Sequence, residues 1–304
     1  MIQNLIHPIL KTLLFTTLCF LLACSKKETT TTTQQTDTLI LSKADSNLLI
    51  AKKNFEQDSS ENNYIWLGRR LGYLSRFDEA ITIFTNGIEK YPESYALYRH
   101  RGHRYISKRQ FDLAINDLNK AAKLMKGRPL EIEPDGIPNK LNKPLSSVQF
   151  NVWYHLALAY YLQGDFKKAE TAYLECMKVS DNDDLLVATT DWLYMTYRKM
   201  NDKKSADKIL LKITPSLEII ENDSYYKRLQ MYQGKLPADS LLIVDANRSD
   251  ADLSIATQGY GVGNWYLYNG DSAKAKEIFD RVLQGNSTAS FGYIAAEVDR
   301  KRMN

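Results

Sequence analysis

Apolar residues recur along most of the chain with the period of an α-helix, and the helical segments come in pairs. Two such segments lie in SENNYIWLGRRLGYLSRFDEAITIFTNGIEKYPE, which starts at Ser60. The same two segments return 34 residues later in SYALYRHRGHRYISKRQFDLAINDLNKAAKL, which starts at Ser94. Small residues occupy matching positions, with Gly68 aligned to Gly102, and larger apolar residues fill the space between the segments of a pair. The pattern predicts two consecutive helical hairpins.

Four more hairpins are predicted from Phe150 onward. The third copy, FNVWYHLALAYYLQGDFKKAETAYLECMKVS, is the clearest, and the fourth, WLYMTYRKMNDKKSADKILLKI, has Met195 in place of the central small residue. A fifth hairpin between Tyr225 and Leu242 is degenerate, and the last, YGVGNWYLYNGDSAKAKEIFDRVLQG, restores the pattern. The segment SFGYIAAEVDRKRMN predicts a C-terminal capping helix with its polar tail outward. Because one hairpin cannot bury its own apolar face, we expect an all-α solenoid of about five to six stacked units.

The 34-residue period and its residue types resemble the tetratricopeptide repeat, or TPR. The resemblance covers most of the chain, from about Asn47 to Arg300. It implies a helical-hairpin solenoid in which the first helix of each unit lines a concave surface. It also implies that protein or peptide partners bind along that surface.

A proline-rich insertion separates units two and three. The segment KGRPLEIEPDGIPNKLNKPL, within about residues 126–148, holds four of the eight prolines, and its PDG is a turn signal. Long ordered loops are often functional. Residues 129–145 therefore either have a function, as a lid over the groove or as a contact with a partner, or form a solvated surface excursion, and the sequence leaves these alternatives open.

The N-terminal residues have a different pattern from the repeats. Lys11 precedes an apolar stretch from Leu13 to Ala23, which would rise only about 16 Å as a helix and is too short to span a bilayer. We therefore predict a signal peptide over residues 1–23 and a flexible threonine-rich tether over residues 24–38. The solenoid domain is predicted over residues 39–304.

The junction LLACSKK resembles the bacterial lipobox. The resemblance implies cleavage before Cys24, a thioether-linked diacylglycerol on its sulfur and an acyl chain such as palmitate on the new amine, which together give a stable lipid anchor. Ser25 is not the aspartate that marks inner-membrane retention in enterobacteria, so the implied location is the outer membrane, facing the periplasm. An ordinary secretory signal followed by a chance cysteine is the alternative, and surface display stays open.

Composition and charge exclude several classes of function. The 304-residue chain has a net charge of only +4, so wholesale nucleic-acid binding is not expected. The sequence contains no Walker motif, nucleophile elbow, HExxH or paired CxxC. Cleavage and lipidation would leave Cys176 as the only free thiol, which we interpret as a buried structural residue. We therefore expect a protein without enzymatic activity and without a cofactor.

Three histidines, His100, His103 and His155, lie on the predicted first helices of units two and three. Their spacing makes a metal site conceivable, but no cysteine or HExxH-type partner accompanies them, and we predict no bound metal. The alternative function is a small-ligand or metal-binding protein, or an enzyme, that uses this cluster with the 129–145 loop as its lid.

A basic groove is the main candidate site. Arg99 and His103 are four residues apart and share a helix face, with Arg69 one repeat earlier. Planar donors beside aromatic residues suit a carboxylate or an acidic peptide. The inward positions implied by the TPR resemblance are Asn62, Arg69, Tyr73, Arg99, His103, Asn151, Tyr154 and Tyr161. The alternative is a solvated face, or a face that is salt-bridged internally to Glu131, Glu133 or Asp135.

Lipobox, tether and solenoid together resemble the NlpI-type TPR lipoproteins. The likeness is most detailed in WLYMTYRKMNDKKSADKILLKI, MYQGKL and NWYLYNGDSAKAKEIF. It implies a homodimeric, membrane-anchored adaptor for cell-wall endopeptidases and a periplasmic protease, that is, for protein partners of the cell envelope. The insertion at residues 129–145 has no counterpart there, so the identity of the partner stays open.

Overall fold

The computed structural model describes residues 42–134, 139, 141, 143–245, 247 and 250–303. The predicted signal peptide, Cys24 and the tether lie outside these residues. Among the described helices, none combines the length and the apolar character that a bilayer-crossing segment needs.

The described residues form α-helices and one short 3-10 helix, with a single isolated β-bridge as their only extended pairing. The helices are, in chain order, α1 (Lys43–Gln57), α2 (Glu61–Tyr73), α3 (Phe77–Lys90), α4 (Tyr95–Ser107), α5 (Phe111–Leu124), α6 (Val148–Gln163), α7 (Phe166–Lys178), α8 (Asp183–Lys199), α9 (Lys203–Leu210), α10 (Asp223–Tyr232), η1 (Ala238–Leu242), α11 (Ala251–Tyr268), α12 (Ser272–Leu283) and α13 (Phe291–Arg302).

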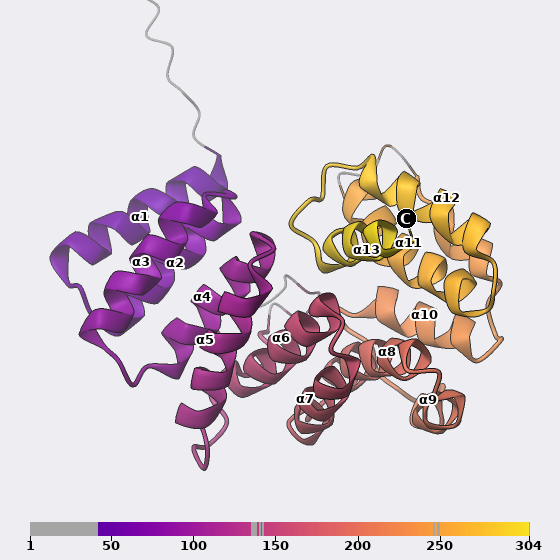
Figure 1. The fold of residues 1–304 in the computed structure, drawn as a ribbon. Coiled ribbons are helices and arrows are strands. Elements are labelled where there is room, and N and C mark those ends of the chain that lie inside the picture. The colour runs from indigo at the N-terminus through magenta and orange to yellow at the C-terminus, as the bar shows by residue number, and fades with distance from the viewer. Residues whose placement is uncertain are drawn as a thin grey trace, which may run out of the picture. The chain divides into compact units, whose positions relative to one another are not determined.

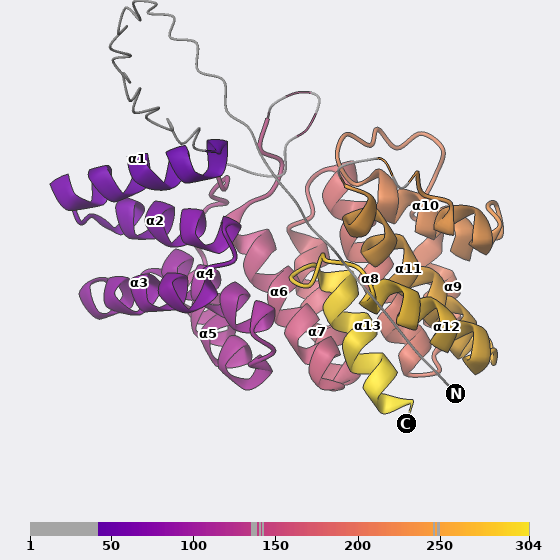
Figure 2. The same cartoon turned by 90° about the horizontal axis from the view of Figure 1, so that it is seen from above.

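Consecutive helices pack as hairpins: α2 with α3, α4 with α5, α6 with α7, and α8 with α9 (Figures 1 and 2). The first helix of each pair also contacts the first helix of the next pair, so that α2, α4, α6 and α8 form one layer. This layer carries most of the residues predicted to face a groove. The all-α hairpin solenoid predicted from the sequence is confirmed.

Glycine lies where the two helices of a hairpin approach each other most closely. A Cβ atom on Gly68 of α2 would lie 2.4 Å from the ring of Phe84 on α3. A Cβ atom on Gly102 of α4 would lie 2.8 Å from the side chain of Leu118 on α5. Real Cβ atoms do not come this close to other atoms, so the packing of each hairpin requires the small residue that defines the repeat.

The later units depart from the regular repeat as the sequence predicts. Met195 is fully buried within α8, where the other units have a small residue. In the fifth unit α10 is followed only by the 3-10 helix η1, and α11 with α12 restores a complete hairpin. Cys176 is a free, fully buried thiol, and burial raises its pKa to about 12, which agrees with a structural role.

The C-terminal helix does more than cap the last unit. Helix α13 packs on α11 and α12 and also contacts α6, in the middle of the chain. Arg109, just after α4, donates a hydrogen bond to Glu297 of α13 at 2.8 Å, and Arg302 donates to the carbonyl oxygen of Leu162 at 2.7 Å. These contacts place Phe291, the first residue of α13, beside the candidate site described next.

Candidate functional site

A cavity of 620 Å³ is lined mainly by α2, α4, α6, α8 and α10, with single residues from α1, α3 and α13 and with Glu133 and Ser146 from the insertion. Its volume falls in the range of pockets that bury a small ligand or a short piece of peptide. Most of the basic side chains come from α2 and α4, and most of the aromatic side chains come from α6, α10 and α13. The hairpin stacking thus brings together residues from five of the repeat units.

Two buried arginines, Arg69 and Arg99, lie on the basic side of the cavity. Arg69 and Tyr73 lie one turn apart on α2, and Nη2 of Arg69 donates to the hydroxyl of Tyr73 at 3.1 Å. Arg99 lies on the neighbouring α4. The two arginine residues are only 8% and 7% exposed. Because the local dielectric is low, charge contacts made here are stronger than contacts at the surface.

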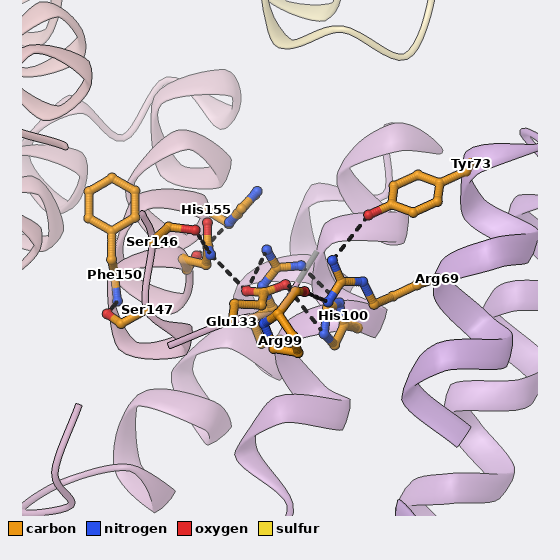
Figure 3. Close-up of polar contacts among 11 residues, drawn as sticks. Arg69, Tyr73, Arg99, His100, Glu133, Ser146, Ser147, Phe150 and His155 are labelled. Atoms are coloured by element: carbon orange, nitrogen blue, oxygen red, sulfur yellow. Dashed lines mark hydrogen bonds and ion pairs between the residues drawn. The ribbon is translucent and has the colours of Figure 1, made fainter. Parts of the chain in front are cut away.

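The carboxylate of Glu133, from the insertion, occupies the centre of this basic group (Figure 3). Its Oε2 lies 3.1 Å from Nη2 of Arg99, and its Oε1 lies 3.5 Å from Nη1 of Arg69. Asn151 donates to Oε2 at 2.7 Å, and Nε2 of His100 lies 3.6 Å from Oε1. Glu133 is 4% exposed. Arg69 and Arg99 are therefore salt-bridged internally to Glu133, as in the alternative that the sequence left open.

The segment that carries Glu133 is attached to the start of α6. Ile132 pairs with Ser147 in an antiparallel bridge, and the amide of Glu133 donates to the carbonyl oxygen of Ser146 at 2.9 Å. Ser147 is also the N-cap of α6, because its hydroxyl accepts from the amide of Phe150 at 3.0 Å. The start of the third repeat therefore fixes where the Glu133 carboxylate lies.

One arginine of the cavity is left without a carboxylate. Arg104, on α4, forms no ion pair with any residue that the structure describes, and its guanidinium lies 5.6 Å from the ring centre of Phe77. Burial and the neighbouring charge of Arg99 together lower the pKa of Arg104 to about 10. The cavity lining holds five basic residues against two acidic ones: Lys43, Arg69, Arg70, Arg99 and Arg104 against Glu133 and Glu221.

The three histidines are neutral members of the same wall. Burial and the charges of nearby arginines lower the pKa of His100, His103 and His155 well below the usual value. The rings of His103 and His155 lie 4.4 Å apart, and Nδ1 of His155 donates to the carbonyl oxygen of Asn151 at 2.5 Å. Within the described part of the chain, no three histidine, cysteine or acidic side chains are grouped to hold a metal ion. The metal-binding alternative therefore has no support in the structure.

Aromatic side chains form the other wall. The rings of Phe150 and Tyr154 on α6 stack at 5.4 Å, and Phe291 lies 5.3 Å from His103 and from His155. An apolar wall facing cations can bind a group that is apolar on one side and anionic on the other. Chemically, the site can bind such a group.

The structure brings together six of the eight predicted groove residues. They line the cavity and are Arg69, Tyr73, Arg99, His103, Asn151 and Tyr154. Asn62 is exposed on α2 and is not part of the lining. Tyr161 is only 1% exposed, and its hydroxyl lies 2.5 Å from that of Tyr260 on α11, so it belongs to the core and not to a groove.

Several lining residues were not predicted. Arg104 follows His103 in the block RHRGHRYIS, but it is not one of the inward-facing positions that the TPR resemblance implies. Phe291 comes from the last helix, far away in the sequence, and no local pattern indicates its return to α4 and α6. Glu133 appears in the sequence only as one of three acidic residues of the insertion.

Two regions of the chain match models of the tetratricopeptide repeat, residues 67–129 and residues 150–183. They contain α3, α4, α5 and α7, all of α6 except its first two residues, and most of the basic side of the cavity. The chain therefore contains TPR units, and TPR proteins generally act as scaffolds for protein interactions. No curated protein matches the sequence.

Solved TPR structures are similar to the chain at low sequence identity. The crystal structure of YrrB, described as a TPR protein with an unusual peptide-binding site, is 15% identical with a TM-score of 0.42, and the match covers 83% of this chain and 97% of that chain. A tetratricopeptide repeat protein from Parabacteroides merdae is 14% identical with a TM-score of 0.47, and the match covers 86% of this chain and 93% of that chain.

Proposed function

We propose that this protein is a non-catalytic TPR adaptor, anchored in the bacterial cell envelope, that binds a protein or peptide partner in the 620 Å³ cavity. The observation that carries the proposal is Arg104, a partly buried cation without an ion pair among the described residues, in a cavity with an aromatic wall. A buried charge is costly unless it is paired, so an incoming carboxylate gains more here than at the surface.

The proposed partner segment has an acidic residue next to an apolar or aromatic one. The acidic group would face Arg104, while the neighbouring side chain would pack on Phe150 and Tyr154. Tyr73 is 54% exposed and lies where the cavity meets solvent, so a segment that enters passes this residue. Binding pockets typically combine a small number of polar contacts with an apolar lining.

The anchoring part of the proposal rests on the sequence. Lipidation at Cys24 would hold the protein at the outer membrane, facing the periplasm, on a tether of residues 24–38. A membrane anchor and a short tether raise the effective concentration of any partner in the same membrane. The finer proposal, an NlpI-type homodimeric adaptor of envelope enzymes, rests on the likeness of the C-terminal repeats.

A photo-crosslinking amino acid placed at Tyr73 in the full-length protein in cells tests the proposal. We expect it to trap a discrete partner through a segment that contains aspartate or glutamate. The same amino acid at Leu211, which is 79% exposed and lies outside the cavity lining, should not trap this partner.

Binding of the trapped segment is then measured with purified protein. Arg104→Met should weaken it at least tenfold, while Lys108→Gln, a change to a residue of the same region outside the cavity lining, should not alter it. A partner trapped equally from positions 73 and 211, or unaffected by Arg104→Met, contradicts a role for the cavity.

A further inference from the structure

We propose that Glu133 is a tethered internal ligand of the cavity, which competes with the acidic group of the partner for Arg69 and Arg99. This inference rests on the proposed function and concerns the regulation of the same site. The partner would complete its binding by displacing residues 131–134 from the arginines.

The burial pattern of the segment supports this interpretation. From Lys126 to Pro134, Glu133 is the only buried residue, whereas Leu130 and Ile132 are 46% and 52% exposed. A loop that is held by the hydrophobic effect would bury the leucine and the isoleucine. This segment instead leaves both side chains in solvent and places only the Glu133 carboxylate among the arginines. A carboxylate from another molecule could therefore make the same contacts with Arg69 and Arg99.

The charge balance of the cavity gives the competition its effect. With Glu133 in place, Arg69 and Arg99 share one carboxylate, and Arg104 has no ion pair among the described residues. If Glu133 left, Arg69, Arg99 and Arg104 would all face an incoming acidic group. The affinity for that group is therefore reduced by the fraction of molecules in which Glu133 occupies the cluster.

The attachments of the segment make Glu133 a strong competitor. The amide of Val148 donates to the carbonyl oxygen of Glu131 at 2.8 Å, and Gln149 donates from its side chain to the carbonyl oxygen of Pro129 at 2.7 Å. The carboxylate of Glu131 accepts a hydrogen bond from the hydroxyl of Tyr95 on α4. These contacts keep the Glu133 carboxylate at a high effective concentration beside the arginines. A partner must offset this advantage with contacts elsewhere in the cavity.

A structural role alone makes a different prediction. If Glu133 serves only to neutralise Arg69 and Arg99, its removal destabilises the fold without opening a site. If Glu133 is a competitor, its removal also increases the affinity for a carboxylate that is supplied from outside.

The test supplies the internal ligand as a separate molecule. The probe is a fluorescein-labelled peptide of residues 128–134, RPLEIEP, and its binding to the full-length protein is measured by fluorescence anisotropy. We expect Glu133→Gln to bind this peptide at least tenfold more tightly than the wild type. The peptide RPLEIQP should not show the increase. Glu131→Gln makes the same charge change two residues away. It removes only the contact with Tyr95, so its increase in affinity should be much smaller than that of Glu133→Gln.

A reversible lock provides the second measurement. Ile132 and Ser147 face each other across an antiparallel bridge, a pairing that suits a disulfide, so Ile132→Cys with Ser147→Cys should fix the segment when oxidised. In the Glu133→Gln background the lock should reduce peptide binding to the wild-type value, and a reductant should restore it.

The competition is overturned if folded Glu133→Gln binds RPLEIEP no more tightly than the wild type, or if Glu131→Gln gives the same increase. If Glu133→Gln does not fold, Glu133→Asp keeps the charge with a shorter reach and should bind several-fold more tightly than the wild type. No increase with Glu133→Asp also overturns it. Since this test needs no natural partner, its failure is distinct from failure of the crosslinking at Tyr73.

Discussion

The carboxylate of Glu133 lies 3.1 Å from the guanidinium of Arg99, although Glu133 belongs to the insertion and Arg99 to the second repeat. The insertion therefore contributes a charged residue to the layer of first helices that forms the cavity. It neutralises part of a basic surface that the repeats alone would leave open. Arg104 forms no ion pair among the described residues, and this determines the first prediction.

Arg104→Met should stabilise the protein while it weakens partner binding. Burial lowers the pKa of Arg104 to about 10, which shows that the folded state disfavours this charge. Replacing it with an apolar side chain of similar length should raise the free energy of unfolding by about 1 kcal/mol. Urea unfolding at pH 7.5 measures the change.

Arg101→Met is the matched control on the same helix. Arg101 makes two hydrogen bonds to the carboxylate of Asp117, at 2.7 Å and 2.8 Å, and Asp117 is only 6% exposed. The substitution leaves a buried carboxylate unpaired and should lower the free energy of unfolding by about 3 kcal/mol. Equal effects of the two substitutions would contradict the distinction between a paired and an unpaired arginine.

The buried histidines should make the protein less stable in mild acid. Their pKa values are lowered in the folded state, so below about pH 6.5 the unfolded chain binds protons that the folded chain does not. Stability is then fully present above pH 6.5 and falls as the pH drops through this value. The loss should be about 1.4 kcal/mol per histidine between pH 7.5 and pH 5.5.

Urea unfolding of the wild type and of His103→Gln over this pH range isolates the effect. Between pH 7.5 and pH 5.5, the free energy of unfolding of the variant should fall less than that of the wild type, and the difference should equal the contribution of one histidine. Burial raises the pKa of Asp191 to about 6, which changes stability in the opposite direction, but this group is common to both proteins and cancels in the comparison. Parallel pH curves for the two proteins would show that His103 is not held neutral.

The repeat architecture was predictable because it is encoded locally. Gly68 and Gly102 recur in the sequence at the spacing of the hairpins, and each is required by contact with one large residue of the paired helix. The position of α13 was not predictable in the same way. The contact of Phe291 with His103 depends on how each repeat is rotated relative to the one before it, summed over several repeats. No short sequence pattern indicates that rotation.

The candidate site shows the same division. Arg69 and Arg99 follow from the helix period, since they occupy inward positions of consecutive repeats. The choice of Glu133 over Glu131 as their partner depends on the bridge that attaches the insertion to α6, which composition does not reveal. Tyr161 also satisfies the helix period, but the returning C-terminal repeats bury it against Tyr260.

The anchor makes a prediction that is independent of the cavity. Cys24→Ser removes the sulfur that would carry diacylglycerol, so the protein should no longer incorporate labelled palmitate and should move from the membrane fraction to the soluble fraction. Fractionation after metabolic labelling measures both effects. A Cys24→Ser variant that still carries label and stays in the membrane would refute the lipobox interpretation.

The turns between paired helices offer a stabilising substitution. Ser75, between α2 and α3, has a φ of 58°, in the left-handed region that costs an L-residue with a Cβ atom about 1 kcal/mol. The turn of the last hairpin has Gly270 with a φ of 96°. A Cβ atom at this position would have no other atom within 4 Å. Ser75→Gly should therefore raise the free energy of unfolding by about 0.5 kcal/mol, because relief of strain exceeds the entropy that glycine loses on folding. Gly270→Ala is the reverse change and should lower the free energy by about 1 kcal/mol, since it introduces strain without a clash. If Gly270→Ala is neutral, backbone conformation does not limit the stability of these turns, and any gain from Ser75→Gly must have another origin.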